Sequence, residues 1–477
     1  MTLCAISQNA HIDASAVINL RVKAKMSTAF RRVLVANRGE IAVRIIRACR
    51  ELGLETVQVF SEADRESLAV RLADRAICIG PPPASRSYLN GEFIVSAARI
   101  HGADAIHPGY GFLSENARFA AMCEKEGIAF IGPPSDVMAL MADKSMARRI
   151  AAEAGVPTVP GSNGSVSNVA EAMAVAKRVG YPAMLKASAG GGGRGIRVVW
   201  NESEVADQYA QAAREAQAAF GDGAIYVEKY LTDIRHVEVQ ILSDGETILH
   251  LGERDCSIQR RNQKLLEESP SPAVDETLRA EIGAAAVHLC QHVGYKSAGT
   301  VECIVDGRNG QFYFMEMNTR IQVEHPVTET VTGVDIVKQQ IRIAEGLPLG
   351  LRQSDIRLHG HAIECRINAE DPDNEFAPCP GEITRFHAPG GPGIRVDSHI
   401  YGGYRIPPYY DSLVAKLIAW GHDRDEAIAR MRSALSEMQV EGIKTTIPFH
   451  QKLLQQDRFR DGNVHTKFVE DILMESR

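Results

Sequence analysis

Beyond a short N-terminal stretch, the pattern of apolar and polar residues predicts an α/β unit. Residues 33–36 are an apolar run typical of a buried strand, and apolar residues then recur at helical spacing from Ile41 to Leu52. A second strand is expected over 56–60. A strand, a helix and a strand in close succession form a βαβ unit, which requires a parallel sheet covered by helices. We expect this region to extend to about residue 140.

A glycine cluster at 190–195 lies between two strand-like segments, 183–186 and 196–199. The glycines match the G-x-G-x-x-G dinucleotide pattern, but the β-branched run that follows does not predict the required helix. No Walker-type G-x-x-x-x-G-K-[ST] motif is present. We therefore expect a glycine loop between two strands, with backbone N–H groups able to cover a polyphosphate. A flexible loop without function is the alternative, but Lys186 and Arg194 favour anion binding.

A predicted β-hairpin around Asn309 places two acidic residues opposite each other. With the turn centred there, Glu302 faces Glu316 and Thr300 faces Asn318. Opposed residues of an antiparallel pair have Cβ atoms about 5 Å apart, so two carboxylates there need a cation. Carboxylate and amide oxygens favour Mg²⁺ or Mn²⁺. The alternative is a pair of solvated glutamates on an exposed face.

Polar residues continue to alternate with mostly apolar ones beyond this hairpin. An extended chain places these polar groups on one face, and Pro326 favours extension because it disfavours helical angles at His325. We predict a reaction track, with metal and phosphate at one end and anion capture with a base at the other. The row consists of Glu316, Asn318, Arg320, Gln322 and Glu324.

Two further segments carry weaker signals. Residues 254–264 contain four cations, which predicts local anion binding, although a solvated basic loop is the alternative. A third region begins near Gly360 with short strand-like runs and many turn residues. It ends in a helix whose apolar face contains Ile428, Met431, Leu435 and Met438.

Composition narrows the classes of protein. The chain of 477 residues is too long for a single hydrophobic core of ordinary size, so two or three domains are expected. Its content of 45% hydrophobic and 24% charged residues is typical of globular proteins. A formal charge of -7 disfavours a nucleic-acid partner, and no apolar run is long enough to cross a membrane. Nine cysteines without a C-x-x-C pair predict free thiols in a reducing compartment, with the cytoplasm as the default.

From about Arg32 onward, the chain resembles the biotin carboxylase component of biotin-dependent carboxylases such as acetyl-CoA carboxylase, in the ATP-grasp superfamily. The matching strings are ANRGEIAVRIIRAC (36–49), HPGYGFLSEN (107–116), KASAGGGGRG (186–195), EKYL (228–231), ERDCSIQRRNQK (253–264), EMNTRIQVEHPVTE (316–329) and GHAIECRINAEDP (360–372). The resemblance implies an ATP-grasp fold with α/β and α+β character, an N-terminal parallel α/β (Rossmann-like) domain and a C-terminal mixed β/α domain.

The expected domains follow these boundaries. Residues 1–29 are read as a disordered or non-native extension, with an organellar presequence as the alternative. The N-terminal α/β domain is expected over 30–143. The ATP-grasp domain is expected over 144–350, including a mobile lid at about 160–230, and the C-terminal domain over 351–475.

The resemblance also implies a reaction, the ATP-dependent carboxylation of biotin by bicarbonate through carboxyphosphate. It implies ATP contacts from Lys144, Lys186, Gly192, Gly193, Glu228, Lys229, Leu231, His236, Gln259, Asn262 and Glu302. Mg²⁺ or Mn²⁺ would be bound by Glu302, Glu316 and Asn318. Bicarbonate and biotin would be held by Lys264, Arg320, Gln322, Val323 and Arg366. Catalysis would depend on Arg320, Lys264, the general base Glu324, and Arg366 as stabiliser of the biotin enolate.

Partners follow from the same resemblance. The sequence lacks a Met-Lys-Met biotin-attachment tripeptide and a carboxyltransferase region, so we expect a free-standing, homodimeric subunit. It would work with a separate biotin carboxyl carrier protein and carboxyltransferase, as in fatty acid biosynthesis. Asn262 departs from the family, since many relatives have His there. The alternatives are another ATP-grasp ligase that joins a carboxylate to an amine, and an inactive nucleotide-binding subunit.

Overall fold

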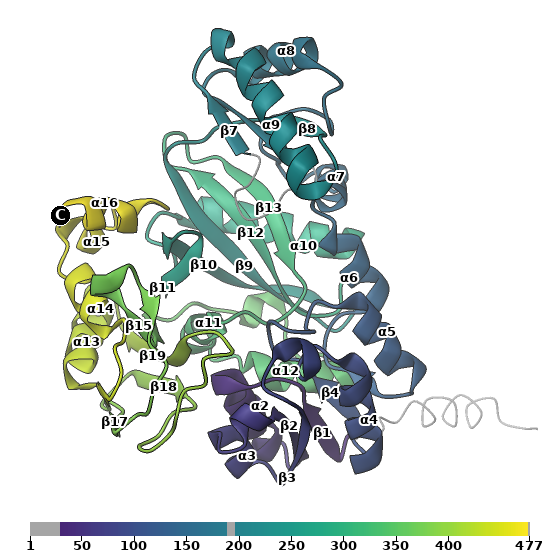
Figure 1. The fold of residues 1–477 in the computed structure, drawn as a ribbon, viewed down its shortest axis with the longest axis vertical. Coiled ribbons are helices and arrows are strands. Elements are labelled where there is room, and N and C mark those ends of the chain that lie inside the picture. The colour runs from purple at the N-terminus through teal and green to yellow at the C-terminus, as the bar shows by residue number, and fades with distance from the viewer. Residues whose placement is uncertain (1–28, 188–195, 476–477) are drawn as a thin grey trace, which may run out of the picture.

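The computed structural model describes residues 29–187 and 196–475, and its N-terminal part confirms the predicted α/β region. Five parallel strands form a sheet in the order β3-β2-β1-β4-β5 (Figure 1). The strands are β1 (Arg32–Val35), β2 (Glu55–Ser61), β3 (Arg75–Gly80), β4 (Ala105–His107) and β5 (Ala129–Phe130). The helices are α2 (Gly39–Glu51), α3 (Leu68–Leu72), α4 (Gly91–His101), α5 (Ala117–Lys125) and α6 (Ser135–Ala142). The predictions for 1–28, Gly192 and Gly193 lie outside the described residues.

A small lobe stands apart from the rest of the molecule at the top of Figure 1. Its antiparallel sheet has the order β7-β6-β8 and carries helices α8 and α9. Its elements are α8 (Val169–Val179), β6 (Ala183–Ala187), β7 (Ile196–Val199), α9 (Val205–Phe220) and β8 (Ile225–Lys229), and α7 (Lys144–Glu153), which precedes them, packs in the core of the body. Strands β6 and β7 flank the glycine cluster and pair with each other, as predicted. The lobe has its own apolar core, which includes Leu185, Val199 and Ile225.

The ATP-grasp and C-terminal regions share one eight-stranded antiparallel sheet, in the order β13-β12-β9-β10-β11-β14-β19-β18. Its strands are β9 (Ile234–Ser243), β10 (Ile248–Arg260), β11 (Gln263–Ser269), β12 (Ser297–Asp306), β13 (Phe312–Asn318), β14 (His361–Asn368), β18 (Ile394–Ser398) and β19 (Leu413–Gly421). Because β11 pairs with β14, side chains of both regions face each other across a continuous sheet.

Helices cover this sheet and complete the chain. They are α10 (Glu276–His292), α11 (His325–Thr332), α12 (Ile336–Ala344), α13 (Arg424–Glu437), α14 (Ile447–Leu453), α15 (Asp457–Arg460) and α16 (Phe468–Glu475). Short strands β15 (Glu370–Asp371), β16 (Ala377–Pro378), β17 (Arg385–His387) and β20 (Gln439–Glu441) complete the C-terminal region. Helix α13 buries Ile428, Met431 and Leu435 against the sheet, which confirms the predicted apolar face.

The cysteines and the apolar character of the helices bear on the expectations from composition. All cysteines among the described residues are free thiols, in agreement with the sequence. Within 29–187 and 196–475, no helix has both the length and the apolar character needed to cross a membrane.

Candidate active site

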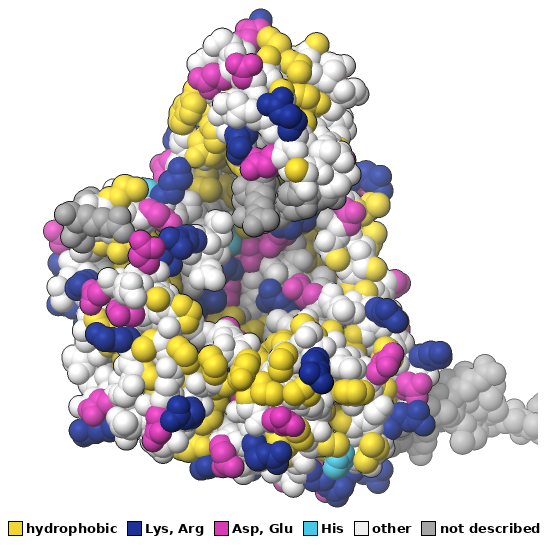
Figure 2. Space-filling model, in the orientation of Figure 1, with side chains coloured by type: hydrophobic (Ala, Val, Ile, Leu, Met, Phe, Trp, Pro, Cys, Tyr) yellow, Lys and Arg dark blue, Asp and Glu magenta, His cyan; other side chains and the backbone are white. Residues whose placement is uncertain are grey.

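A cavity of about 1410 Å³ lies between the small lobe and the body of the molecule. Figure 2 shows this hollow, with acidic and basic side chains on its floor. It brings together most of the residues that the sequence singled out. They are Lys144, Lys186, Glu228, His236, Gln259, Asn262, Lys264, Glu302, Glu316, Asn318, Arg320, Gln322, Val323, Glu324 and Arg366.

The hairpin has the predicted register, with Glu302 opposite Glu316 and Thr300 opposite Asn318. Glu302 is buried, so the alternative of two solvated glutamates is wrong for this residue. Its carboxylate lies 2.9 Å from His236 Nε2 and 3.0 Å from Lys264 Nζ. Burial alone would raise the pKa of Glu302, but the neighbouring His236 and Lys264 hold it well below its usual value.

The donor set on this hairpin fits a hard divalent cation. Glu302 Oε1 accepts a hydrogen bond from Asn318 Nδ2 at 2.9 Å, which places the amide beside the carboxylate. Glu316 Oε2 lies 2.7 Å from Lys144 Nζ, so this carboxylate also faces a positive charge. Carboxylate and amide oxygens are the ligands that Mg²⁺ prefers. The two opposed carboxylates fit such an ion, and the assignment of Glu302, Glu316 and Asn318 as its ligands stays a prediction, since the Asn318 amide oxygen accepts from Arg320 at 2.9 Å.

The predicted extended row beyond the hairpin is wrong. Strand β13 ends at Asn318, the chain turns, and α11 begins at His325 with Pro326 in its first turn. Proline is tolerated there because the first N–H groups of a helix have no intrahelical acceptor. Ile321 inserts into the core at the turn. The polar side chains on either side of it still reach the cavity, but they reach it from a turn and not from a strand.

Lys264 occupies the centre of three carboxylates. Its Nζ lies 2.6 Å from Glu238, 3.0 Å from Glu302 and 2.7 Å from Glu324. Burial lowers the pKa of Lys264, but the surrounding carboxylates hold it well above its usual value. The ammonium is therefore a permanent positive charge at the edge of the cavity.

Glu324 lies between Lys264 and Arg366. Its two oxygens accept from Lys264 Nζ at 2.7 Å and from an Arg366 nitrogen at 2.9 Å. Although burial opposes ionisation, these cations hold the pKa of Glu324 well below its usual value. The carboxylate is consequently ionised at neutral pH, which is the form that a general base requires. Arg366 also donates to Glu267, so its guanidinium is fixed from two sides.

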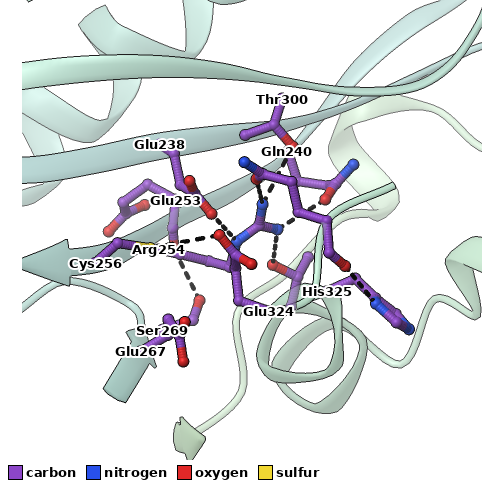
Figure 3. Close-up of polar contacts among 12 residues, drawn as sticks. Glu238, Gln240, Glu253, Arg254, Cys256, Glu267, Ser269, Thr300, Glu324 and His325 are labelled. Carbon is purple, nitrogen blue, oxygen red and sulfur yellow. Dashed lines mark hydrogen bonds and ion pairs between the residues drawn. The ribbon is translucent and has the colours of Figure 1, made fainter. Parts of the chain in front are cut away.

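The cations of residues 254–264, for which local anion binding is predicted, lie in different environments. Arg254 is completely buried and donates to Glu238, Gln240 and Thr300, as Figure 3 shows with Glu324 nearby. Its remaining bonds go to Thr328 and Gln322. Of the four cations in this segment, Lys264 alone is among the described residues that line the cavity. A count of charges cannot distinguish a buried, fully bonded arginine from an exposed one.

A second group of cations lies at the base of the lobe. Lys186 Nζ donates to Glu228 at 2.6 Å, and Arg148 contacts the same carboxylate. Burial, together with the neighbouring Arg148 and Lys144, lowers the pKa of Lys186 to about 8. Such a cluster suits the phosphates of a nucleotide.

Two of the expected ATP contacts, Lys229 and Leu231, are not among the described residues that line the cavity. Lys229 donates to the backbone carbonyls of Gly180 and Tyr181 within the lobe, and Leu231 is buried. The side chains of both are absent from the described cavity lining, so their role stays a prediction.

Sequence reasoning missed Glu115, which holds the segment after β13. Its carboxylate accepts from Arg320 Nε at 2.9 Å and from the backbone N–H of Thr319 at 3.1 Å. The string HPGYGFLSEN contains Glu115 and was a signal, but its turn residues alone do not reveal a partner so distant in the sequence.

Comparison with known families covers nearly the whole described chain. Residues 29–138 match the family "Biotin carboxylase, N-terminal domain" and residues 364–471 match "Biotin carboxylase C-terminal domain". Residues 143–352 match "Carbamoyl-phosphate synthase L chain, ATP binding domain".

Among curated relatives, biotin carboxylase 1 of Bacillus subtilis is 58% identical over 442 residues, which are 92% of this chain and 98% of the relative. The 2-oxoglutarate carboxylase small subunit of Hydrogenobacter thermophilus is 54% identical over 443 residues, which are 93% of this chain and 93% of the relative.

Solved structures agree with this. The biotin carboxylase domain dimer of Hydrogenobacter thermophilus 2-oxoglutarate carboxylase, in complex with MgADP, ADP and bicarbonate, is 53% identical with a TM-score of 0.86, covering 93% of this chain and 98% of that one. Biotin carboxylase of Campylobacter jejuni, in a β,γ-ATP complex, is 49% identical with a TM-score of 0.87, covering 93% and 99%. The chain therefore belongs to the biotin carboxylase family.

Proposed function

We propose that this chain catalyses the ATP-dependent carboxylation of biotin with bicarbonate, which yields carboxybiotin, ADP and phosphate. The observation that carries the proposal is the placement of ionised Glu324 between Lys264 and Arg366, beside the opposed Glu302 and Glu316. The names of the relatives support it, and so does the bicarbonate and MgADP complex of the Hydrogenobacter thermophilus domain.

The nucleotide would occupy the lobe side of the cavity. Lys144 and Lys186 would bind its phosphates, and His236 would contact it next to Glu302. Glu302, Glu316 and Asn318 would hold Mg²⁺ or Mn²⁺, which neutralises phosphate charge when bound. The cations at the lobe and the carboxylates of the hairpin would thereby orient the γ-phosphate toward the floor of the cavity.

Bicarbonate would bind on the other side of the hairpin. Lys264 and Arg320 would attract the anion, and the turn formed by Gln322 and Val323 would shape its site. Glu324 would accept the proton of bicarbonate, so that a bicarbonate oxygen attacks the γ-phosphate and forms carboxyphosphate.

Carboxyphosphate would then break down to CO₂ and phosphate, and the phosphate would take the N1′ proton of biotin. Arg366 would stabilise the resulting enolate, because a guanidinium stays charged and does not give up its proton. The hydrogen bond that Arg366 Nε donates to Glu267 at 2.6 Å holds the guanidinium in place for this role.

The proposal extends to organisation and partners. We propose three domains, at residues 30–143, 144–350 and 351–475. We also propose that residues from about 160 to 230 move as a lid. The substrate-bearing partner is proposed to be a biotin carboxyl carrier protein, with a separate carboxyltransferase, a homodimeric state and a cytoplasmic location. Relatives named for pyruvate and 2-oxoglutarate carboxylases support the view that the final acceptor is set by the partner.

The test is bicarbonate-dependent ADP release by the purified chain with Mg²⁺ and ATP, measured with and without free biotin. Biotin should accelerate release, and Glu324→Gln should reduce the biotin-dependent rate about a hundredfold or more, because the amide cannot accept a proton. Glu153→Gln, on the exposed face of α7, is the matched control and should behave as the wild type.

Three outcomes would contradict the proposal. A wild-type chain without bicarbonate-dependent turnover would refute it. Turnover that instead requires an amine and a larger carboxylate would identify the alternative ligase, and nucleotide binding without turnover would identify an inactive nucleotide-binding protein.

A further inference from the structure

A buried lysine in the C-terminal region, Lys416, has no role in the site described above. It lies in β19, and no part of its side chain is exposed. Its register partners are Arg366 on β14 and Asp397 on β18. A lysine is almost never fully buried unless its ammonium is bonded, so the contacts of this one need a reason.

The ammonium of Lys416 joins the three regions of the chain. Its Nζ donates to the backbone carbonyl of Val323 at 2.8 Å and lies 3.1 Å from Glu40 Oε1. Glu40 is buried in the first turn of α2, and its carboxylate accepts from the hydroxyl of Tyr110. Glu40 and Tyr110 belong to the N-terminal strings ANRGEIAVRIIRAC and HPGYGFLSEN, which the proposed chemistry leaves largely unexplained.

The carbonyl that Lys416 binds lies at a sensitive point. Residues 319–324 are neither strand nor helix, so their described backbone is not held by a sheet ladder. Thr319 is anchored by Glu115, and the carbonyl of Gln322 accepts from His325 at the start of α11. The Val323 carbonyl lies between these anchors, next to the residue whose carboxylate meets Lys264 and Arg366.

We infer that Lys416, held by Glu40, is a positioning residue that fixes the Val323 carbonyl and thereby the turn that presents Gln322 and Glu324 to bicarbonate. This inference rests on the proposed function. A hydrogen bond from a charged donor in a buried site is roughly twice as strong as a neutral one and restricts the backbone accordingly. The alternative is a buried ion pair that only ties the regions together and leaves the chemistry untouched.

Removing Lys416 alone would leave Glu40 as an uncompensated buried charge, and that variant could fail to fold. The double variant Lys416→Met/Glu40→Gln removes both charges with little change in volume. The matched control is Glu40→Gln alone, which keeps the ammonium and its bond to Val323. The difference between these two proteins reports the loss of the ammonium, which removes its bond to the Val323 carbonyl and its charge beside Glu364 and Asp397.

Steady-state ADP release with free biotin is then measured for both proteins as a function of bicarbonate and of ATP. The double variant should show a kcat/KM for bicarbonate that is about tenfold to hundredfold below that of the control. The KM for ATP should be unchanged, because Lys144 and Lys186 do not contact the altered residues in the described structure. Hydrogen exchange of residues 319–325 should be faster in the double variant.

The outcomes separate this inference from the proposed function. A folded double variant with the bicarbonate kcat/KM of the control would overturn the role of Lys416 while leaving the proposed function intact. An equal loss of kcat/KM for ATP and for bicarbonate would also overturn the role of Lys416, since such a loss would indicate general damage to the protein. If the double variant is not recovered folded, Lys416→Leu/Glu40→Gln replaces it, since leucine also lacks a donor for the Val323 carbonyl, and an unchanged bicarbonate kcat/KM there is equally decisive. A wild type without bicarbonate-dependent turnover would instead refute the proposed function.

Discussion

Replacing Arg254 by methionine should destabilise the protein far more than removing an exposed arginine. A guanidinium has five N–H donors, and five hydrogen bonds use them all. They run to side-chain oxygens of Glu238 (2.6 Å), Gln240 (2.7 Å), Thr328 (3.0 Å), Thr300 (3.2 Å) and Gln322 (2.7 Å). These acceptors come from β9, β12, α11 and the turn before it, so one side chain connects most of the cavity floor.

The expected magnitude follows from the contacts that would be lost. Arg254→Met leaves the buried carboxylate of Glu238 with Lys264 and without its second cation. Breaking a buried ion pair costs about 3–5 kcal/mol. At about 2–4 °C per kcal/mol for a unit of 150–250 residues, the melting temperature should fall by about 6–20 °C. The melting temperature of Arg254→Lys should lie between those of the wild type and Arg254→Met, because an ammonium has fewer donors than a guanidinium and lacks its planar geometry.

Thermal unfolding followed by calorimetry is the assay, and Arg99→Met is the matched control. The Arg99 side chain is 65% exposed and forms a single ion pair with Glu126 at 2.9 Å, so its removal should cost about 1 kcal/mol or less. If Arg254→Met melts at the temperature of Arg99→Met, the buried bonds do not stabilise the fold and the reasoning is refuted.

Three further predictions concern protons and metal. Because burial and neighbouring cations lower the pKa of Lys186 to about 8, ATP affinity measured by calorimetry should fall as pH rises from about 7 to 9. Lys186→Arg should bind ATP with an affinity that does not change over this pH range. A wild-type affinity that is also independent of pH would contradict the prediction. Burial raises the pKa of Glu267 from 4.5 to about 7, so its contribution to stability is complete below pH 4.5 and is lost as pH rises through about 7. The melting temperature of the wild type, compared with that of Glu267→Gln, should therefore fall as pH rises from 4.5 to about 7. A rise in this difference would contradict the assignment. Glu316→Gln should raise the Mg²⁺ concentration needed for half-maximal ADP release without a matching change for Glu153→Gln, and an unchanged Mg²⁺ requirement would argue against the metal site.

Local pattern was sufficient to predict the hairpin that carries the acidic pair. A turn around Asn309 and the two-residue period of strands determine which residues face each other, and Glu302 is opposite Glu316 as expected. The β-bulge after Glu302 was not predicted, but it lies on the turn side of the pair and leaves the facing residues unchanged. The first βαβ unit was predictable for the same reason, since its signals lie within one short segment.

Contacts between distant segments could not be derived from such patterns. Arg254 meets Thr328 across 74 positions and Lys416 meets Val323 across 93. Burial of these cations depends on how the sheet and α11 pack, and this information is not contained in local charge. The charge count of residues 254–264 therefore did not distinguish Lys264, which lines the cavity, from its buried neighbour Arg254.

The wrong prediction of an extended row also shows why a turn suits this site. A strand rises about 3.3 Å per residue, so a straight row from Glu316 to Glu324 would be about 26 Å long, far too long for a one-carbon acid to meet both ends. In the structure, Glu302 and Glu324 both contact Lys264 Nζ, at 3.0 and 2.7 Å, so their carboxylates cannot be farther apart than the sum of these distances. Glu302 is in turn the register partner of Glu316. The turn at 319–324 thus brings the proposed base to the proposed metal pair, and its geometry is a condition for phosphorylating bicarbonate in one cavity.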